Sequence, residues 1–239
     1  MSFLTQPIYY IELSDVIKMG FTTRKGGVNE DWGFNLGYNT NEPKDEIDQN
    51  REKYYELIGQ DSKHVFANQV HGNEILVVDK EGTYDGVDGF VTKERKLVLN
   101  IQTADCLAIL AHDIENKVLG AFHAGWRGTK DKIVQKGIEE MLKLGADLNH
   151  VFFYINPGIK VENYEVGNEL LEYFPESSFV KKEDKIYFDL VKENTRQMKE
   201  AGAKHIRANH MCTYNEKNLY SFRRDKEKAG RTLNFVVMV

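Results

Sequence analysis

A cysteine and a histidine stand at the two open ends of one predicted β-hairpin. Apolar residues at 106–111 and 118–122 flank a short stretch that is rich in turn-forming residues. If the turn is centred directly after Ile114, Cys106 lies opposite His123 and both side chains project from the same face of the sheet. A thiolate beside an imidazole can serve as two ligands of a soft metal such as zinc, or as a nucleophile with its base.

The residues around this pair are polar, whereas a plain apolar core would have valine or leucine there. Gln102 and Asp105 precede the cysteine, and Trp126 and Arg127 follow the histidine. The alternative is a buried free cysteine that packs as a small apolar residue beside a hydrogen-bonded histidine. We favour a functional site because so many polar side chains gather at the predicted strand ends.

A catalytic zinc ion needs three protein ligands and one open position, so a third ligand is required. His71 is the candidate, since it follows a strand predicted at 65–70 and precedes Gly72. A glycine at that point indicates a sharp change of direction that leaves the imidazole exposed at the strand end. The expected ligand set is therefore His71, Cys106 and His123.

Several arginines are candidate anion ligands. Arg24 lies in a loop with two glycines, whose backbone N–H groups and guanidinium could hold a phosphate or could form a solvated turn. Arg127 precedes a helix predicted at 129–144 with Thr129 as N-cap, a position that favours either anions or a salt bridge. A further group fits an ion-pairing surface or a second anion clamp: Arg223, Arg224 and Arg231.

Hydrophobic periodicity predicts the framework that positions these residues. Strands are expected at 8–13, 18–22, 65–70, 74–79, 90–92, 97–102, 106–111, 118–122, 151–155, 204–209 and 232–239, and helices at 45–58, 129–144 and 189–201. The turn at 85–89 is expected to expose its carboxylates to solvent. Cys212 could share a strand face with His210 as a metal ligand, but we favour a structural cysteine there.

Composition excludes some classes of function. The chain has 239 residues, 41% hydrophobic and 29% charged, which is typical of a globular protein with a sizeable core. A net charge of −5 argues against nucleic acid as a partner and favours small molecules. The sequence lacks a recognisable signal peptide or a membrane-spanning run, and its two cysteines indicate no disulfide framework. We expect a cytoplasmic protein without membrane contacts.

Together the motifs resemble the bacterial laccase-domain family, formerly called multicopper polyphenol oxidases and now regarded as purine nucleoside phosphorylases. The motifs that carry the resemblance are Thr-Arg-Lys-Gly-Gly-Val at 23–28, Asn-Leu-Gly at 35–37, Gln-Val-His-Gly at 69–72, Gln-Thr-Ala-Asp-Cys at 102–106, His-Ala-Gly-Trp-Arg-Gly at 123–128, Tyr-Glu-Val-Gly at 164–167, Cys-Thr at 212–213 and Ser-Phe-Arg-Arg-Asp at 221–225. The resemblance implies an α+β fold, a single domain over 1–239 layered α/β/β/α with mixed, largely antiparallel sheets.

The resemblance also implies a function. One zinc ion would be held by His71, Cys106 and His123, and the substrates would be inorganic phosphate with adenosine, inosine or methylthioadenosine, with additional deamination of adenosine. Candidate substrate-binding residues are Arg24, Asn35, Gln69 and Arg127. Asp105 is the candidate proton shuttle in deamination, although strand alternation would point it away from the cysteine and leave it a supporting role.

Other functions stay open at this point. Cys106 and His123 could form a metal-free cysteine hydrolase, and an activity on cell-wall precursors has been suggested for some relatives. A copper polyphenol oxidase is less expected, because a multicopper enzyme needs more histidines than the seven present. A structural zinc site in a binding module would need a fourth ligand, and the sequence offers none nearby. The assembly is expected to be a monomer or a homodimer.

Overall fold

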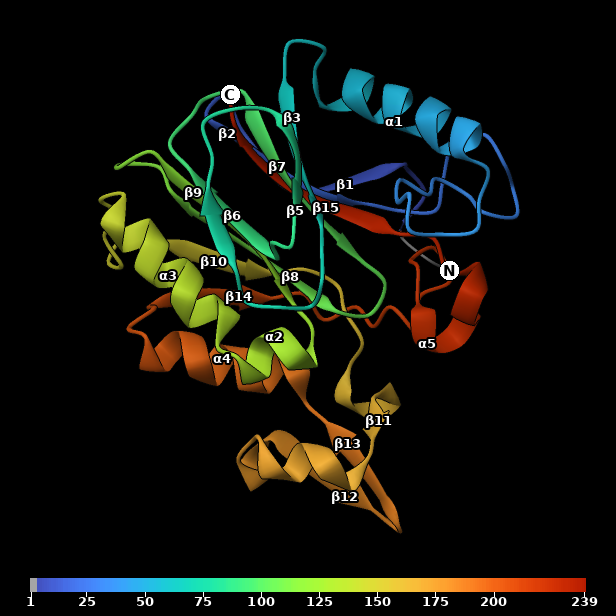
Figure 1. The fold of residues 1–239 in the computed structure, drawn as a ribbon, viewed down its shortest axis with the longest axis vertical. Coiled ribbons are helices and arrows are strands. Elements are labelled where there is room, and N and C mark those ends of the chain that lie inside the picture. Colours follow the sequence, from blue (N-terminus) through green and yellow to red (C-terminus); the bar gives the residue numbers. More distant parts are fainter. Residues whose placement is uncertain (1–3) are drawn as a thin grey trace.

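The computed structural model describes residues 4–239 and shows two six-stranded β-sheets packed face to face (Figure 1). The first sheet has the order β1 (Ile8–Leu13), β2 (Ile17–Thr22), β15 (Thr232–Met238), β7 (Leu97–Thr103), β3 (Lys63–Asn68), β5 (Gly82–Asp85). The second has the order β14 (His205–Ala208), β10 (Phe152–Ile155), β8 (Leu107–Asp113), β9 (Val118–Ala124), β6 (Gly89–Thr92), β4 (Ile75–Val77). Antiparallel pairs outnumber parallel pairs in both sheets.

Helices cover both outer faces. Helix α1 (Lys44–Ile58) packs on the first sheet, and α2 (Trp126–Lys130), α3 (Ile133–Lys143) and α4 (Leu190–Glu200) lie on the second (Figure 1). The remaining elements are α5 (Phe222–Asp225), the small sheet of β11 (Glu165–Val166), β12 (Phe179–Lys182) and β13 (Lys185–Phe188), and 3₁₀ turns at Val161–Asn163, Asn168–Glu172, Glu176–Ser178 and Lys226–Lys228. The predicted layered α/β/β/α fold is confirmed, while the extent of the domain over 1–239 stays a prediction.

Strand alternation explains the layers. Leu97 and Leu99 of β7 pack between the two sheets, whereas Val98 packs toward α1. On β8 the same alternation sends Ala108 between the sheets and Ile109 toward the helices of the other layer. Because successive side chains of a strand point to opposite faces, apolar residues at every position of a strand indicate burial on both sides.

The central hairpin has a different register from the one predicted. Ala108, not Cys106, pairs with His123, because the turn is centred between Glu115 and Asn116. The Asp113 side chain accepts a hydrogen bond from the backbone N–H of Asn116 at 3.0 Å and so determines the turn. The shift is two residues, which keeps every side chain on the predicted face.

The helix predicted at 129–144 is two helices instead of one. Lys132 has a left-handed φ of 61°, which separates α2 from α3. Thr129 is inside α2 instead of capping a helix, and its hydroxyl accepts a hydrogen bond from Asn194 of α4 at 2.9 Å. Thr129 thus contacts a helix 65 residues further along the chain. The hydrophobic periodicity of residues 129–144 carries no information about such a contact or about the break between α2 and α3.

Four short strands were not predicted: β5, β11, β12 and β13. Each is short and mostly exposed or half-buried, so no long run of apolar residues marks it in the sequence. The other predicted strands and helices are found within a few residues of their expected bounds. Across residues 4–239, every helix is too short or too polar to cross a bilayer.

The packing of α3 on β9 gives a test of the fold. A methyl group at Gly137 would lie 2.5 Å from Cε1 of the buried Phe122 ring. Alanine normally stabilises a helix relative to glycine, but overpacking here should outweigh that gain. We expect Gly137→Ala to lower the free energy of unfolding by about 1–2 kcal/mol in urea titrations.

Glu139→Ala on the exposed side of α3 is the matched control and should change that free energy by no more than about 0.5 kcal/mol. A Gly137→Ala protein as stable as the parent would show that the ring of Phe122 adapts to the methyl group.

Candidate metal centre

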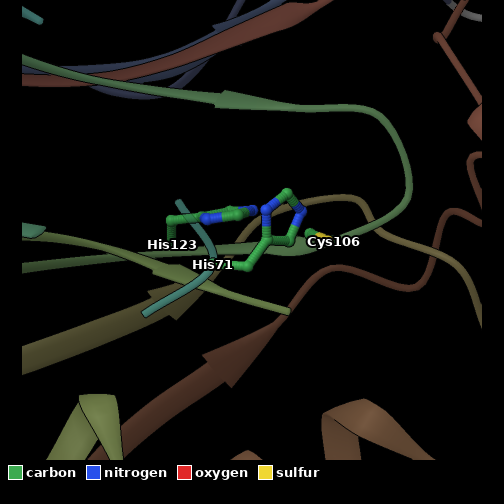
Figure 2. A group of neighbouring side chains, drawn as sticks. All are labelled: His71, Cys106 and His123. Carbon is green, nitrogen blue, oxygen red and sulfur yellow. The ribbon is translucent and has the colours of Figure 1, made fainter. Parts of the chain in front are cut away.

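Three side chains from distant parts of the chain meet at one end of the two-sheet sandwich. The ligand atoms of His71, Cys106 and His123 all lie within 4.8 Å of one another, and Figure 2 shows the three side chains gathered in one cluster. The two imidazole rings are 4.8 Å apart between centroids and nearly perpendicular. His123 is buried, Cys106 is half-buried and His71 is exposed, so the centre opens to solvent on the His71 side.

The topology explains why these residues meet. The chain crosses from the first sheet to the second three times, between β3 and β4, between β5 and β6, and between β7 and β8. His71, Asp88 and Cys106 each lie in one of these crossings. His123 is on β9, two residues after Ala121, and therefore faces the space between the sheets. All four residues consequently lie at the same end of the sandwich.

A buried carboxylate holds two of the ligands in place. Asp88 Oδ1 lies 2.7 Å from Nδ1 of His123. Its oxygens also accept hydrogen bonds from the backbone N–H groups of Val70 at 3.2 Å, His71 at 3.0 Å and Gly72 at 2.7 Å. His71 has a left-handed φ of 60°, and these contacts support that conformation. One side chain thus orients the His123 ring and the loop that presents His71.

The prediction that the 85–89 turn exposes its carboxylates is correct for Asp85 and wrong for Asp88. Asp88 is fully buried. It turns inward because three backbone N–H groups and an imidazole 35 residues away supply its hydrogen bonds. Local sequence does not show such partners. A chemical rule could have pointed to a buried carboxylate near His123, because a histidine that binds a metal usually donates its other ring N–H to a carboxylate or carbonyl.

The pKa values of this cluster reflect its hydrogen bonds. Burial would raise the pKa of the Asp88 carboxyl, but hydrogen bonds from His123 and from backbone N–H groups hold it below its ordinary value. Burial would raise the pKa of the Cys106 thiol as well, yet His123 and His71 lower it to about 6. Burial would lower the pKa of His123, but Asp88 and Cys106 raise it to about 9. These opposite shifts favour a thiolate beside an imidazolium.

The donor set fits a zinc ion. Asp88 accepts from Nδ1 of His123, which leaves Nε2 as the ligand atom, and zinc favours imidazole nitrogen with thiolate sulfur. A methyl group at Gly125 would lie 2.9 Å from Cys106 Sγ and 3.3 Å from Cδ2 of His71, so glycine leaves the ligands room to approach. Among residues 4–239 no fourth histidine, cysteine, aspartate or glutamate joins the group. This argues against a closed structural zinc site.

Asp105 lies beside the centre but is engaged elsewhere. It has a left-handed φ of 92°, so the strand alternation assumed from the sequence does not apply to it. Its Oδ1 accepts a hydrogen bond from the hydroxyl of Thr213 and its Oδ2 from the backbone N–H of Arg223, both at 2.6 Å. The carboxylate therefore holds the 213–223 segment next to Cys106, and the proton-shuttle role stays a prediction.

Two of the predicted substrate-binding residues make internal contacts. Asn35 is fully buried, and its Oδ1 accepts hydrogen bonds from the backbone N–H groups of Gly37 and Arg231. Gln69 uses its side chain to hydrogen-bond both backbone groups of Gln102, at 2.8 and 2.9 Å. Both residues shape the loops around the centre, and their contact with substrate stays a prediction.

The two predicted phosphate ligands differ in their surroundings. Arg24 forms an ion pair with Asp225 at 3.4 Å and donates to the carbonyl of Asp31 at 3.1 Å. Arg127 is exposed, with its guanidinium 4.4 Å from the centroid of the Trp126 ring.

Cys212, for which the sequence favoured a structural role, is buried. Its sulfur accepts a hydrogen bond from the backbone N–H of Lys160 at 3.4 Å.

Residues 18–239 match the family model described as multi-copper polyphenol oxidoreductase laccase. The chain belongs to this family. A purine nucleoside phosphorylase from Deinococcus radiodurans is 34% identical over 219 residues, covering 88% of this chain and 85% of that relative. A purine nucleoside phosphorylase from Corynebacterium glutamicum is 31% identical over 221 residues, covering 87% of this chain and 89% of that relative.

Solved structures of the family have the same fold. The crystal structure of YlmD from Geobacillus stearothermophilus superposes with a TM-score of 0.87 at 27% identity, covering 93% of this chain and 92% of YlmD. The Bacillus licheniformis hypothetical protein YfiH gives a TM-score of 0.91 at 23% identity, covering 99% and 98% of the two chains. The family description mentions several copper ions, whereas residues 4–239 of this member bring together one His-Cys-His group.

Asp88 provides a test of how the centre is held. Asp88→Asn replaces a carboxylate oxygen, which accepts hydrogen bonds, with an amide NH₂ group, which donates them. His123 and the loop that carries His71 should therefore lose their orientation. We expect zinc affinity to fall about 10- to 100-fold in competition titrations with a chromophoric chelator. Asp85→Asn changes the exposed carboxylate of the same turn and should leave the affinity unchanged. Equal affinities for both variants would contradict this role of Asp88.

Zinc affinity should also depend on pH. Between about pH 6 and pH 9 Cys106 is already a thiolate while His123 still carries a proton. Zinc must displace that proton, so the dissociation constant should fall about tenfold per pH unit across this window. Above pH 9 it should level off, and below pH 6 it should change more steeply because the thiol then also loses a proton. A dissociation constant that does not change between pH 6 and 9 would contradict the protonated state of His123.

Proposed function

We propose that this chain is a zinc-dependent purine nucleoside phosphorylase that acts on adenosine, inosine and methylthioadenosine and has an adenosine deaminase side activity. Two relatives at 31–34% identity are named purine nucleoside phosphorylases. The observation that carries the proposal is the solvent-facing group of His71, Cys106 and His123, which has no fourth ligand among residues 4–239. We further propose that it acts in the cytoplasm as a monomer or a homodimer.

Phosphorolysis transfers the ribosyl group from a purine to phosphate. The bond between C1′ and N9 breaks with its electron pair going to the purine, and an oxygen of hydrogen phosphate forms a bond with C1′. The phosphate proton ends on the purine, so adenosine gives adenine and ribose 1-phosphate. The protein must place a dianion next to a sugar, which needs cationic side chains at the site. Deamination instead consumes water and releases ammonia, giving inosine.

The residues of the centre have separable tasks. His71, Cys106 and His123 would hold the zinc ion, and Asp88 keeps the His123 ring in the tautomer that binds through Nε2. Bound zinc would supply a Lewis acid at the open side of the cluster, the chemistry that removal of a purine amino group requires. Arg127 lies on α2, four residues after His123, and is the first candidate for holding phosphate.

A metal-free cysteine hydrolase is the second candidate, and a specific observation favours it. Asp88, His123 and Cys106 stand in series, with the carboxylate on one side of the imidazole and the sulfur on the other. In the same order, the three would be the residue that orients the base, the base itself and the nucleophile. A hydrolase acting on a cell-wall precursor would use the same three groups. His71 separates the two functions, since only a metal site needs it.

Adenosine distinguishes these functions directly. The zinc-loaded protein is incubated with adenosine, with and without phosphate, and adenine, hypoxanthine and inosine are quantified by chromatography. We expect phosphate-dependent release of adenine together with slower formation of inosine. Inosine alone would restrict the protein to deamination, and no product would contradict the proposal.

His71→Ala provides the second half of the test. The variant keeps Asp88, His123 and Cys106, but we expect it to lose zinc and at least a hundredfold in phosphorolysis, roughly the effect of losing several kcal/mol of Lewis-acid stabilisation. Retained phosphorolysis without bound zinc would contradict the zinc-dependent function. Cys212→Ser is the control for the cysteines, because Cys212 makes structural contacts away from the cluster, and it should keep both zinc and activity.

A further inference from the structure

Two arginines beside the metal centre lack carboxylate partners among the described residues 4–239. Arg127 has its guanidinium 4.4 Å from the Trp126 ring centroid and no side-chain hydrogen bond within that part of the chain. Arg223 has its guanidinium 5.4 Å from the ring centroid of Tyr164, and its Nη1 donates to the carbonyl of Glu165 at 2.9 Å. Most of the ten N–H donors of this pair are therefore available to a ligand.

Neighbouring arginines are used to hold the fold. Arg224 donates to the carbonyls of Thr213, Tyr214, Glu216 and Leu219 and pairs with Asp225. Arg231 donates to the carbonyls of Ala229, Gly230 and Asn39. Arg24 pairs with the same Asp225 and lies over the Tyr220 ring at 5.2 Å. The structure thus separates arginines that shape the loops from two whose guanidinium groups are not required by the fold.

Both of these arginines are attached to segments that carry the metal ligands. Arg127 is two residues from Gly125, where an added methyl group would lie 2.9 Å from Cys106 Sγ and 3.3 Å from Cδ2 of His71. The backbone N–H of Arg223 donates to Asp105 at 2.6 Å, and Asp105 directly precedes Cys106. Both arginines therefore begin on segments beside the centre, and each guanidinium is held against an aromatic ring that limits its movement.

The half-buried phenol of Tyr164 lies near these groups. Its pKa is raised by burial and by the nearby charge of Cys106, while the charges of Arg223 and Arg127 act in the opposite direction. Tyr164 therefore lies within electrostatic range of Cys106 and both arginines. Its ring supports Arg223 directly.

We propose that Arg127 and Arg223 together form the binding site for the inorganic phosphate of phosphorolysis at the open side of the metal centre. Planar guanidinium groups match the oxygens of phosphate in bidentate hydrogen bonds, and two of them balance the charge of a dianion. This proposal rests on the proposed function and replaces Arg24, which pairs with Asp225 and donates to the carbonyl of Asp31, by Arg223.

The test uses Arg223→Gln and Arg127→Gln in the zinc-loaded full-length protein. The backbone N–H of Arg223 makes the structural bond to Asp105, so the substitution leaves that contact in place. We expect each variant to raise the KM for phosphate about 10- to 100-fold, the effect of losing a hydrogen bond between charged groups. The KM for adenosine should change less than about twofold, and deamination, which consumes no phosphate, should persist.

Controls separate binding from structure. Arg207→Gln makes the same chemical change on an exposed residue of β14 and should leave the KM for phosphate unchanged. Arg24→Gln should lower thermal stability without a selective effect on that KM. Arg223→Lys should recover part of the phosphate affinity, because it restores the charge without the bidentate geometry. An unchanged KM for phosphate in Arg223→Gln and Arg127→Gln would overturn the proposal.

Direct binding keeps this test independent of the proposed function. Inorganic phosphate is titrated calorimetrically into the parent protein and into both glutamine variants in the absence of nucleoside. Binding to the parent that is lost in the variants supports the site even if no phosphorolysis is detected. Phosphate that binds all three proteins equally, or does not bind the parent, overturns it.

Discussion

The carboxylate of Asp88 is the interaction on which the centre depends. A buried carboxylate is costly unless hydrogen bonds replace its hydration, and here one imidazole and three backbone N–H groups do so. These bonds connect two crossings of the chain to the end of β9. As a consequence, the position of His71, the tautomer of His123 and the ionisation of Cys106 are physically coupled. Disturbing the carboxylate changes all three ligands.

The two-sheet sandwich provides the place for this coupling. Each crossing from the first sheet to the second leaves the ladder of backbone hydrogen bonds, and there side chains are free to approach one another. Apolar residues such as Leu99 and Leu110 fill much of the interior between the sheets. The fold thus concentrates its polar chemistry at one end and its hydrophobic stabilisation in the middle. Loops attached to a rigid scaffold commonly carry function in this way.

The same three residues, Asp88, His123 and Cys106, suit either a metal ligand pair with its supporting carboxylate or a nucleophile with its base. Both uses require a deprotonated sulfur and an oriented imidazole. What makes the cluster suitable for a metal ion is the addition of His71 at the exposed side. Arg127 and Arg223, which lack carboxylate partners among residues 4–239, then add positive charge near this side.

Residue type and local spacing in the sequence were enough to predict most strands and the grouping of His71, Cys106 and His123, while the layered fold came from the family resemblance. The sequence placed Cys106 and His123 on one face even though the register was wrong by two, since strand alternation depends only on parity. Only the tertiary structure decided that Asp88 is buried, that α2 and α3 are separate and that Arg24, unlike Arg223, pairs with a carboxylate among residues 4–239. Each of these depends on hydrogen-bond partners that are distant in the chain, and local patterns carry no information about which distant groups meet.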